Sequence, residues 1–262
     1  IGQAAAIVDT AAGPASTYSL ADLESSVAFN RAIKDVYAAD PRLNLDGFQI
    51  NCAGKHPRFN SITLDGISTN DRFGLNTNGY STATGQPFPF DAIEQVAVEL
   101  APFDVTYGGF SACNVNAVTK SGANEWEGNV FYEYSDQDLI NDELDGQPLT
   151  SEAYEKTKIG ISGGGAIIQD RLFFYGAYEE TESPQFVAQG YAGSGNGAER
   201  PWLSESDYNR VAAIASSGAY GGYDGGGMPQ NRPNEEEKIL ARVDWNINGD
   251  HNAAFIYNYY EG

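Results

Sequence analysis

The chain has 262 residues and a formal net charge of −21, from 15 basic and 36 acidic side chains. Nucleic-acid binders need clustered lysine and arginine to displace counterions from phosphates, so this charge argues against a nucleic-acid partner. Glycine and aromatic residues are abundant, with 30 Gly, 16 Tyr and 13 Phe, which is typical of a β-rich fold with long loops. No apolar run reaches the roughly 20 residues that a transmembrane helix needs.

Two short helices are predicted near the N-terminus. Residues 1–17 are small and featureless, and we interpret them as a linker or N-terminal segment. Ser19 is a typical N-cap residue, and Asp22 stands at the capping position three residues later. Asn30 predicts a second N-cap, before a helix that Pro41 ends. The apolar positions of the two helices are Leu20, Leu23 and Val27, and then Ile33, Val36 and Tyr37.

Beyond residue 60 the apolar residues recur at every second position, which is typical of strands. A two-residue turn is predicted at Asp65-Gly66, and residues 68–89 are expected to be a long polar loop of the kind that carries recognition. The strands cover residues 61–66, 92–100 and 112–120. With the two helices they form a small mixed α/β domain, which we place at residues 18–123.

Five further strands are predicted, at 127–134, 155–167, 171–180, 237–248 and 252–260. The fourth has an apolar face of Ile239, Ala241, Val243, Trp245 and Ile247, and a largely polar face of Lys238, Leu240, Arg242, Asp244 and Asn246. Long connections at 135–154 and 181–236 alternate with tight turns at 168–170 and 249–250. This asymmetry is typical of a transmembrane β-barrel with short periplasmic turns and long outer loops. A soluble β-sandwich explains the alternation equally well, but it does not explain the regular difference in connection length.

A barrel has consequences for residues 124–262, which would form its N-terminal part. Strands of this length suit a tilted span, and aromatic residues near their ends suit interfacial girdles. These aromatic residues are Tyr132, Tyr134, Tyr178, Trp245, Tyr257 and Tyr259. Five strands cannot close a barrel, because an open edge in lipid leaves backbone groups unpaired. Ile1 is not an initiator residue and no signal peptide is recognisable, so we expect a mature or truncated chain with most of the barrel absent.

The two cysteines, Cys52 and Cys113, are candidates for a disulfide. They are far apart in the sequence, and the absence of a Cys-x-x-Cys motif makes a zinc site an unfavourable interpretation. In an oxidising compartment a bridge is the simpler hypothesis, and closing so long a loop contributes roughly 4 kcal/mol in the chain-entropy model. The alternative is a pair of buried, unpaired thiols.

Several stretches between Pro57 and Tyr134 resemble the TonB-dependent outer-membrane transporters, most closely their Oar-like branch, which is related in style to SusC-like receptors. The stretches are PRFNSITLDGISTNDRFGL (57–75), FPFDAIEQVAVELAPFDVTYGGF (88–110), NVNAVTKSGANEWEGNVFYEY (114–134), and NCAG and SACN around the two cysteines. They are specific as a set, and no one of them carries the resemblance alone. The resemblance implies an α+β plug domain inside a transmembrane antiparallel β-barrel of about 22 strands, of which about five lie in this sequence.

The resemblance also implies a function. Such proteins transport a ligand (a peptide or protein fragment, a glycan or a metal chelate) across the bacterial outer membrane, energised by the TonB complex and gated by the plug. The plug is expected toward the periplasm and the long loops outside, with outer-membrane lipid, lipopolysaccharide and a lipoprotein lid as further candidate partners. The coupling peptide, called the TonB box, precedes the plug in this family, and AAIVDT at 5–10 matches it only feebly. The alternative is a structural, adhesive or secretion-related surface protein that uses the barrel as an anchor.

The loop after the Asp65-Gly66 turn is the candidate ligand-binding site, because outward-facing plug loops contact ligand in this family. Arginine beside aromatic residues can bind an anionic or planar ligand by charge-assisted hydrogen bonds and stacking. The candidate residues are Arg58, Asn70, Asp71, Arg72, Phe73, Asn76 and Tyr80. The alternative is that Arg58 and Arg72 pair with acidic residues of the barrel wall and hold the plug.

The stretch SDQDLINDELDG (135–146) is a candidate calcium site, because crowded carboxylates are the ligands that Ca²⁺ prefers. The candidate ligands are Asp136, Asp138, Asp142 and Asp145. It lacks the glycine placement and the terminal Glu of an EF-hand, so a solvated acidic loop is the alternative interpretation. No other cofactor is expected.

Three other features carry no chemistry. ISGGGA (161–166) lacks the spacing of a nucleotide-binding motif, and we expect its glycines to leave room for the plug or an aromatic neighbour. Lys120 lies at a strand end and not at a helix start, which argues against a phosphate-binding loop. His56 and His251 are far apart and have no Ser or Cys nucleophile pattern around them. We therefore expect no enzymatic activity.

Overall fold

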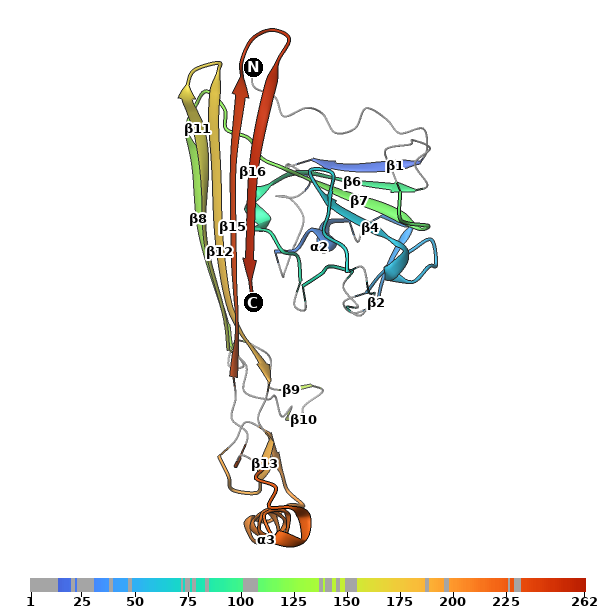
Figure 1. Ribbon diagram of the computed structural model, residues 1–262, viewed down its shortest axis with the longest axis vertical. Helices are drawn as coiled ribbons and strands as arrows, with labels where there is room; N and C mark the ends of the chain where they lie inside the picture. Colours follow the sequence, from blue (N-terminus) through green and yellow to red (C-terminus); the bar gives the residue numbers. More distant parts are fainter. Residues whose placement is uncertain are drawn as a thin grey trace. The chain divides into compact units, whose positions relative to one another are not determined.

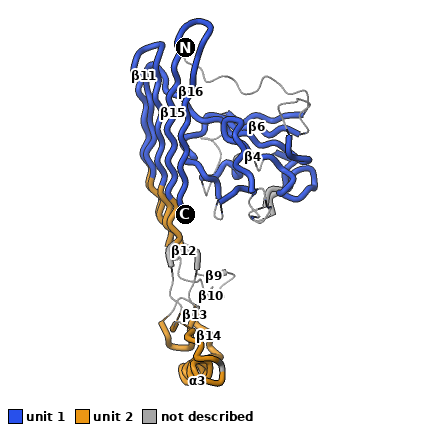
Figure 2. Tube along the Cα trace, in the orientation of Figure 1, with its two compact units in different colours: residues 1–130, 160–179, 237–262 blue, residues 131–159, 180–236 orange. Residues whose placement is uncertain are grey.

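The computed structural model describes most of the chain. The described residues are 14–19, 22, 31–37, 40–46, 49–71, 73, 76, 79–82, 85–100, 108–136, 139, 143–144, 147–148, 155–186, 189–195, 198–225, 227–228 and 232–262. They fall into two compact units (Figure 2): unit 1 holds residues 1–130, 160–179 and 237–262, and unit 2 holds residues 131–159 and 180–236. The predicted domain boundaries after residues 17 and 123 stay a prediction.

Unit 1 contains a five-stranded sheet, here called the N-terminal sheet, with strand order β1-β6-β7-β4-β5 (Figure 1). Its strands are β1 (Ala15–Ser19), β4 (Ser61–Leu64), β5 (Ile67–Ser68), β6 (Ile93–Leu100) and β7 (Cys113–Thr119). β7 runs parallel to β4 and antiparallel to β6, and all seven of its residues are buried. The core around it includes Ile62, Leu64, Val96, Val98, Val115 and Ala117.

The predicted strands and turn of this part are confirmed. Asp65 and Gly66 both have positive φ, at 48° and 80°, and join β4 to β5 as a two-residue hairpin turn. The predicted helix through Ile33 is confirmed as α2 (Ile33–Tyr37), whereas its proposed N-cap, Asn30, lies outside the described residues. A two-stranded hairpin of β2 (Leu43–Asp46) and β3 (Gln49–Cys52) follows.

The first predicted N-cap is also confirmed. The Ser19 backbone N–H donates to Asp22 Oδ2 at 2.9 Å, and the Asp22 N–H donates back to Ser19 Oγ at 3.4 Å. The apolar positions proposed for this helix, Leu20, Leu23 and Val27, lie outside the described residues. Strand β1, which ends at the cap, was not predicted because its small residues have no strand pattern of their own. It forms where β6 offers a free edge.

The second sheet, here called the long-stranded sheet, has the strand order β16-β15-β12-β11-β8 (Figure 1). Its strands are β8 (Glu127–Asp136), β11 (Glu155–Ile168), β12 (Leu172–Phe186), β15 (Arg232–Asn246) and β16 (Asn252–Glu261). All five predicted strands are confirmed, and β12 and β15 extend beyond their predicted ends. The predicted tight turns lie between β11 and β12 and between β15 and β16.

Burial in this sheet is opposite to that of a soluble sheet. Charged side chains on one face are buried, with Glu179 1%, Lys238 5% and Arg242 6% exposed. Large apolar side chains are exposed, including Ile161 at 57% and Phe255 at 67%. A polar inner face and an apolar outer face are typical of a transmembrane barrel wall, which confirms the predicted fold class for the strands in this chain.

Unit 2 carries a folded connection between β12 and β15. It contains the parallel pair β13 (Gln189–Tyr191) and β14 (Ala198–Arg200), and the helix α3 (Glu205–Ala215). Ser204 caps α3 by accepting from the Asp207 N–H at 3.1 Å. The long connection predicted over 181–236 therefore contains a helix that was not predicted, although Ser204 with Asp207 three residues later was a readable cap signal. Within the described ranges, no helix is long and apolar enough to cross a membrane.

Candidate functional site

The polar residues of the predicted ligand-binding loop are used to fold the loop itself. Asn70 accepts from the Ile62 N–H at 2.7 Å and donates to the Asn60 carbonyl at 3.0 Å. Asp71 accepts from the N–H groups of Phe73 at 2.9 Å and Asn76 at 2.7 Å. These contacts fix the backbone as Asx turns do, so the loop has a defined shape.

The remaining residues of this loop lie in different surroundings. Tyr80 is buried and packs edge-on against Phe88, with ring centroids 6.2 Å apart. Phe73 is 85% exposed and Arg58 is also exposed. Arg72 lies outside the described residues. The structure thus brings Asn70, Asp71 and Asn76 together and leaves Phe73 at the surface, and ligand contact stays a prediction.

The predicted disulfide joins Cys52 and Cys113, with Cα atoms 5.9 Å apart and both side chains buried. It ties the end of β3 to the start of β7.

The predicted calcium ligands are only partly described: Asp136 accepts from Tyr134 Oη at 2.9 Å and from the Leu139 N–H at 3.0 Å. Asp138, Asp142 and Asp145 lie outside the described residues, and no group of three metal-binding side chains occurs among those described.

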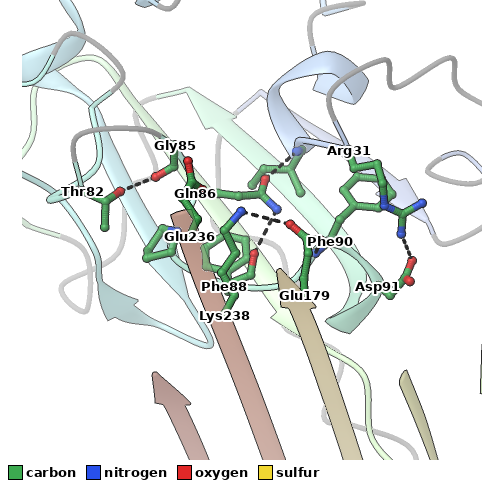
Figure 3. Close-up of polar contacts among 12 residues, drawn as sticks. Arg31, Thr82, Gly85, Gln86, Phe88, Phe90, Asp91, Glu179, Glu236 and Lys238 are labelled. Carbon is green, nitrogen blue, oxygen red and sulfur yellow. Dashed lines mark hydrogen bonds and ion pairs between the residues drawn. The ribbon is translucent and has the colours of Figure 1, made fainter. Parts of the chain in front are cut away.

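A first cluster of polar contacts joins the N-terminal sheet to the inner face of the long strands (Figure 3). Lys238 Nζ on β15 pairs with Glu179 Oε1 on β12 at 3.0 Å. The second oxygen, Glu179 Oε2, accepts from the Phe90 N–H at 3.2 Å. Tyr175 Oη donates to the Asp91 carbonyl at 2.7 Å, which adds a second point of attachment beside Phe90.

The segment that receives these contacts, residues 86–91, is fixed by hydrogen bonds of its own and by contacts with Arg31 and Ile33. Gln86 Oε1 accepts from the Ile33 N–H at 2.8 Å, and Gln86 Nε2 donates to the Phe88 carbonyl at 3.2 Å. The Arg31 guanidinium lies 5.3 Å from the centre of the Phe90 ring and pairs with the Asp91 carboxylate. With the segment fixed in this way, the Phe90 N–H donates to Glu179 (Figure 3), and the Asp91 carbonyl accepts from Tyr175.

A second cluster centres on Arg242 of β15. Its Nη1 donates to the Thr119 carbonyl at 2.8 Å and to Thr119 Oγ1 at 3.0 Å. Its other nitrogens donate to Asp244 at 2.8 and 2.9 Å. Asp65 accepts from the Thr119 N–H and hydroxyl and lies 3.6 Å from Arg242. The predicted hairpin turn and the end of β7 therefore meet one buried arginine.

These polar contacts lie beside an apolar one, because the core cluster of the N-terminal sheet also includes Tyr175, Ala177 and Leu240 of the long strands. A buried ion pair offsets its desolvation cost only while both partners and their hydrogen bonds stay together. Glu179, Lys238 and Arg242 each satisfy that condition through the N-terminal sheet or through each other. The arrangement can hold the two parts in register, and separating them exposes polar groups that water can solvate.

Glycines make room where the chain passes from the N-terminal sheet into β8. A Cβ on Gly163 would lie 2.8 Å from the Glu127 carbonyl oxygen, and one on Gly165 would collide with the Trp126 ring. One on Gly122 would lie 2.7 Å from the Gly165 carbonyl oxygen. The expectation that glycines in ISGGGA leave room for an aromatic neighbour is confirmed.

Comparisons with known proteins agree with this geometry. Residues 118–191 match the family described as "Outer membrane beta barrel domain". The chain is 23% identical over 242 residues to the TonB-dependent transporter Oar of Myxococcus xanthus, covering 87% of this chain and 21% of that protein. Among solved structures, the outer-membrane transporter YddB of Escherichia coli matches with a TM-score of 0.60, 14% identity, and coverage of 90% of this chain and 31% of that one. The siderophore receptor PirA of Pseudomonas aeruginosa matches with a TM-score of 0.57, 13% identity, and coverage of 94% and 35%.

The chain has the fold of a TonB-dependent outer-membrane transporter. The resemblance predicted from the sequence is confirmed, and so is the location in the bacterial outer membrane. The chain spans about a fifth of the length of the Oar transporter that it matches.

The charged residues that join the two parts of this transporter fold were not predicted as site residues. Lys238 and Arg242 were recognised only as members of a polar strand face, and Glu179 was not singled out. A usable signal existed, because ionisable residues on a strand whose other face is apolar are expected to meet a partner inside the barrel. What the sequence does not identify is which residue each one meets.

Proposed function

We propose that this chain is the plug and first wall strands of a protein that transports a ligand across the outer membrane in a TonB-dependent manner. In this proposal residues 18–123 are the plug and gate the barrel. One observation carries it: the plug is attached to a polar inner wall through Glu179, Lys238 and Arg242. These polar contacts border an apolar cluster that includes Tyr175, Ala177 and Leu240 of the wall, so a pull is expected to displace the N-terminal part of the plug before it separates the plug from the wall.

The proposed partners follow from the fold. The TonB complex would pull on the chain before the plug, and lipid with lipopolysaccharide would surround the apolar outer face. The ligand class stays open among peptides or protein fragments, glycans and metal chelates. One neighbour of similar fold, a variant of PfeA from Pseudomonas aeruginosa (TM-score 0.57, 16% identity), is described as a ferric enterobactin receptor, which supports the metal chelate without deciding for it.

Two further elements belong to the proposal. A lipoprotein lid is a candidate partner on the outer side, and calcium is a candidate ligand of the acidic stretch 135–146. The proteins of known function that the chain resembles are transporters and receptors, which supports a role without catalysis.

The proposal can be tested in native cells that express the full-length protein with Ala92→Cys. Ala92 is fully buried in a core cluster that also contains Ile33 of α2, so a pull that withdraws α2 should uncover position 92. A small polar maleimide should label the Ala92→Cys variant several-fold more in energised cells than in cells treated with a protonophore. Ser68→Cys is the matched control, because Ser68 is exposed and its variant should be labelled equally in both conditions.

A structural or adhesive anchor is the second candidate function. It is favoured by the folded extension of unit 2, where Trp202 is 77% exposed and α3 has no buried residue. A static anchor predicts that neither the Ala92→Cys variant nor the Ser68→Cys variant changes its labelling when the protonophore is added. Labelling at position 92 that does not depend on energy would therefore favour the anchor over the energised gate.

A further inference from the structure

The disulfide separates two parts of the plug that are held in different ways. Cys52 is the last residue of β3, and Cys113 is the first residue of β7. Among the described residues, the groups whose polar contacts attach the plug to the long strands follow Cys52 in the sequence. They belong to Asp65, Pro87, Phe90, Asp91 and Thr119.

The part before Cys52 is held mainly by the rest of the plug. β1 is an edge strand that pairs only with β6, from Ala15↔Glu99 to Ser19↔Gln95. Arg42 fastens this edge by donating to Ser16 Oγ at 2.5 Å, and Asp40 in turn holds Arg42. β2 and β3 form a separate two-stranded hairpin. An edge strand and a hairpin can be peeled away one hydrogen bond at a time, once Arg31 has released Asp91 and Ile33 has released Gln86.

The part that begins at Cys113 is held much more firmly. β7 is the central strand of the sheet, paired with β4 on one side and β6 on the other. Every residue of β7 is buried, and its last residue, Thr119, is bonded to Arg242 of the barrel wall. Withdrawing β7 would break two ladders and the wall contact together, which makes it the strongest point of the plug.

A force applied to the N-terminus therefore meets the disulfide at a defined place. Once the chain before Cys52 is extended, the bridge passes the load directly to Cys113 and bypasses residues 53–112. The bypassed residues include β4, β5 and β6, and the segment 86–91 that is attached to Glu179.

We propose that the Cys52–Cys113 disulfide is a mechanical stop, which lets a pull on the N-terminus remove the residues before Cys52 and keeps residues 53–119 on the barrel wall. This inference rests on the proposed function, in which the chain before the plug is pulled. The inference gives the bridge a role beyond stabilising the fold: the bridge limits how large an opening a pull on the N-terminus can create.

Force spectroscopy on the full-length protein in lipid vesicles tests the stop. With a handle attached just before Ile1, the oxidised protein should release at most the 51 residues that precede Cys52, or about 180 Å at 3.6 Å per residue. After reduction, with loss of the bridge verified by alkylation, the same pull should release the loop as well. The bridge spans a sequence separation of 61, so the extension should grow by about 220 Å.

Two variants complete the experiment. The double variant Cys52→Ser/Cys113→Ser should behave like the reduced protein, and Ser111→Ala, an exposed neighbour that keeps the bridge, should behave like the oxidised one. If the double variant does not insert into the vesicles, the comparison of oxidised with reduced native protein still tests the stop. Equal extension of oxidised and reduced protein would overturn the stop.

The outcome is separable from that of the proposed function. Equal extension together with energy-dependent labelling at position 92 removes the stop and leaves the gated transporter in place. A longer extension after reduction without energy-dependent labelling removes the transporter and leaves the mechanical property of the bridge.

Discussion

The N-terminal sheet and the long-stranded sheet both contain alternating sequences, but they bury different kinds of residue. In the N-terminal sheet Val96, Val98 and Val115 are buried, as in any water-soluble sheet. In the long-stranded sheet the polar residues Glu179 and Lys238 are buried together with Phe173 and Leu240, whereas other large apolar residues, such as Ile161, are exposed. Alternation therefore separates the two faces of a strand, and the medium beyond each face decides which one is apolar.

The comparison also distinguishes two kinds of attachment. The core of the N-terminal sheet is stabilised by non-directional burial of apolar surface. The contact between the sheets adds directional hydrogen bonds, such as those from Arg242 to Thr119, to an apolar cluster that reaches Tyr175, Ala177 and Leu240 of the long strands. The first kind keeps a domain folded, and the second kind fixes its position.

The largest effect is expected from Lys238→Met, which leaves the Glu179 carboxylate buried without its cation. Breaking a buried pair costs about 3–5 kcal/mol. The loss should appear in the free energy of unfolding of the full-length protein in lipid vesicles, measured by urea titration and tryptophan fluorescence. The double variant Lys238→Met/Glu179→Gln should recover most of the loss, because no unpaired charge remains. Equal losses in the single and double variants would show that the cost does not come from a buried carboxylate left without its cation.

A smaller effect is expected from Ile161→Arg on the outer face of β11. If this face meets lipid, an arginine there should lower the free energy of unfolding in vesicles by about 2–4 kcal/mol, with less effect near the interface. Val211→Arg on α3 is the matched control, because Val211 is 65% exposed and Ile161 is 57% exposed. Val211→Arg should change the free energy by less than about 0.5 kcal/mol. Similar costs at the two positions would contradict an outer face in lipid.

The smallest effect concerns Asp40, which lies in the same part of the chain as the N-terminal sheet. Hydrogen bonds from the Arg42 side chain lower the pKa of Asp40 from 3.8 to about 2. Because the folded state favours the ionised form, this stabilisation is present above about pH 4 and is lost as the pH falls through about 2. It amounts to about 2 kcal/mol.

The measurement is urea unfolding of the full-length protein at several pH values between 2 and 6. Asp40→Asn should be less stable than the native protein at pH 6 and should lose this part of the pH dependence. Parallel pH curves for the two proteins would contradict a role for the Asp40–Arg42 contact.

Much of the architecture could be predicted from the sequence because it depends on local rules. Alternation identified eight strands that the structure contains, and Asp65-Gly66 identified a hairpin turn because both positions require positive φ. The lengths of the connections separated a membrane wall from a soluble sandwich. The glycines of β11 and the pair of cysteines could be interpreted in the same way.

Other features were beyond local rules. β1 has no strand pattern and forms because β6 has an unpaired edge. Asn70, Asp71 and Asn76 have the composition of a binding loop, yet their polar groups are engaged within the loop. Their composition does not reveal this, because the same side chains serve a ligand or a backbone turn equally well.

The sequence by itself determined that this chain has a mixed domain followed by long alternating strands, with one cysteine pair and two kinds of connection. Only the tertiary structure decided that Glu179 meets Lys238 and Phe90, and that Arg242 meets Thr119. Arg242 and Thr119 are 123 positions apart, and period-two alternation specifies a face but not the surface that packs against it. The partners of these charges are set by how the two sheets dock, because a buried charge must find its counterpart in whatever lies opposite.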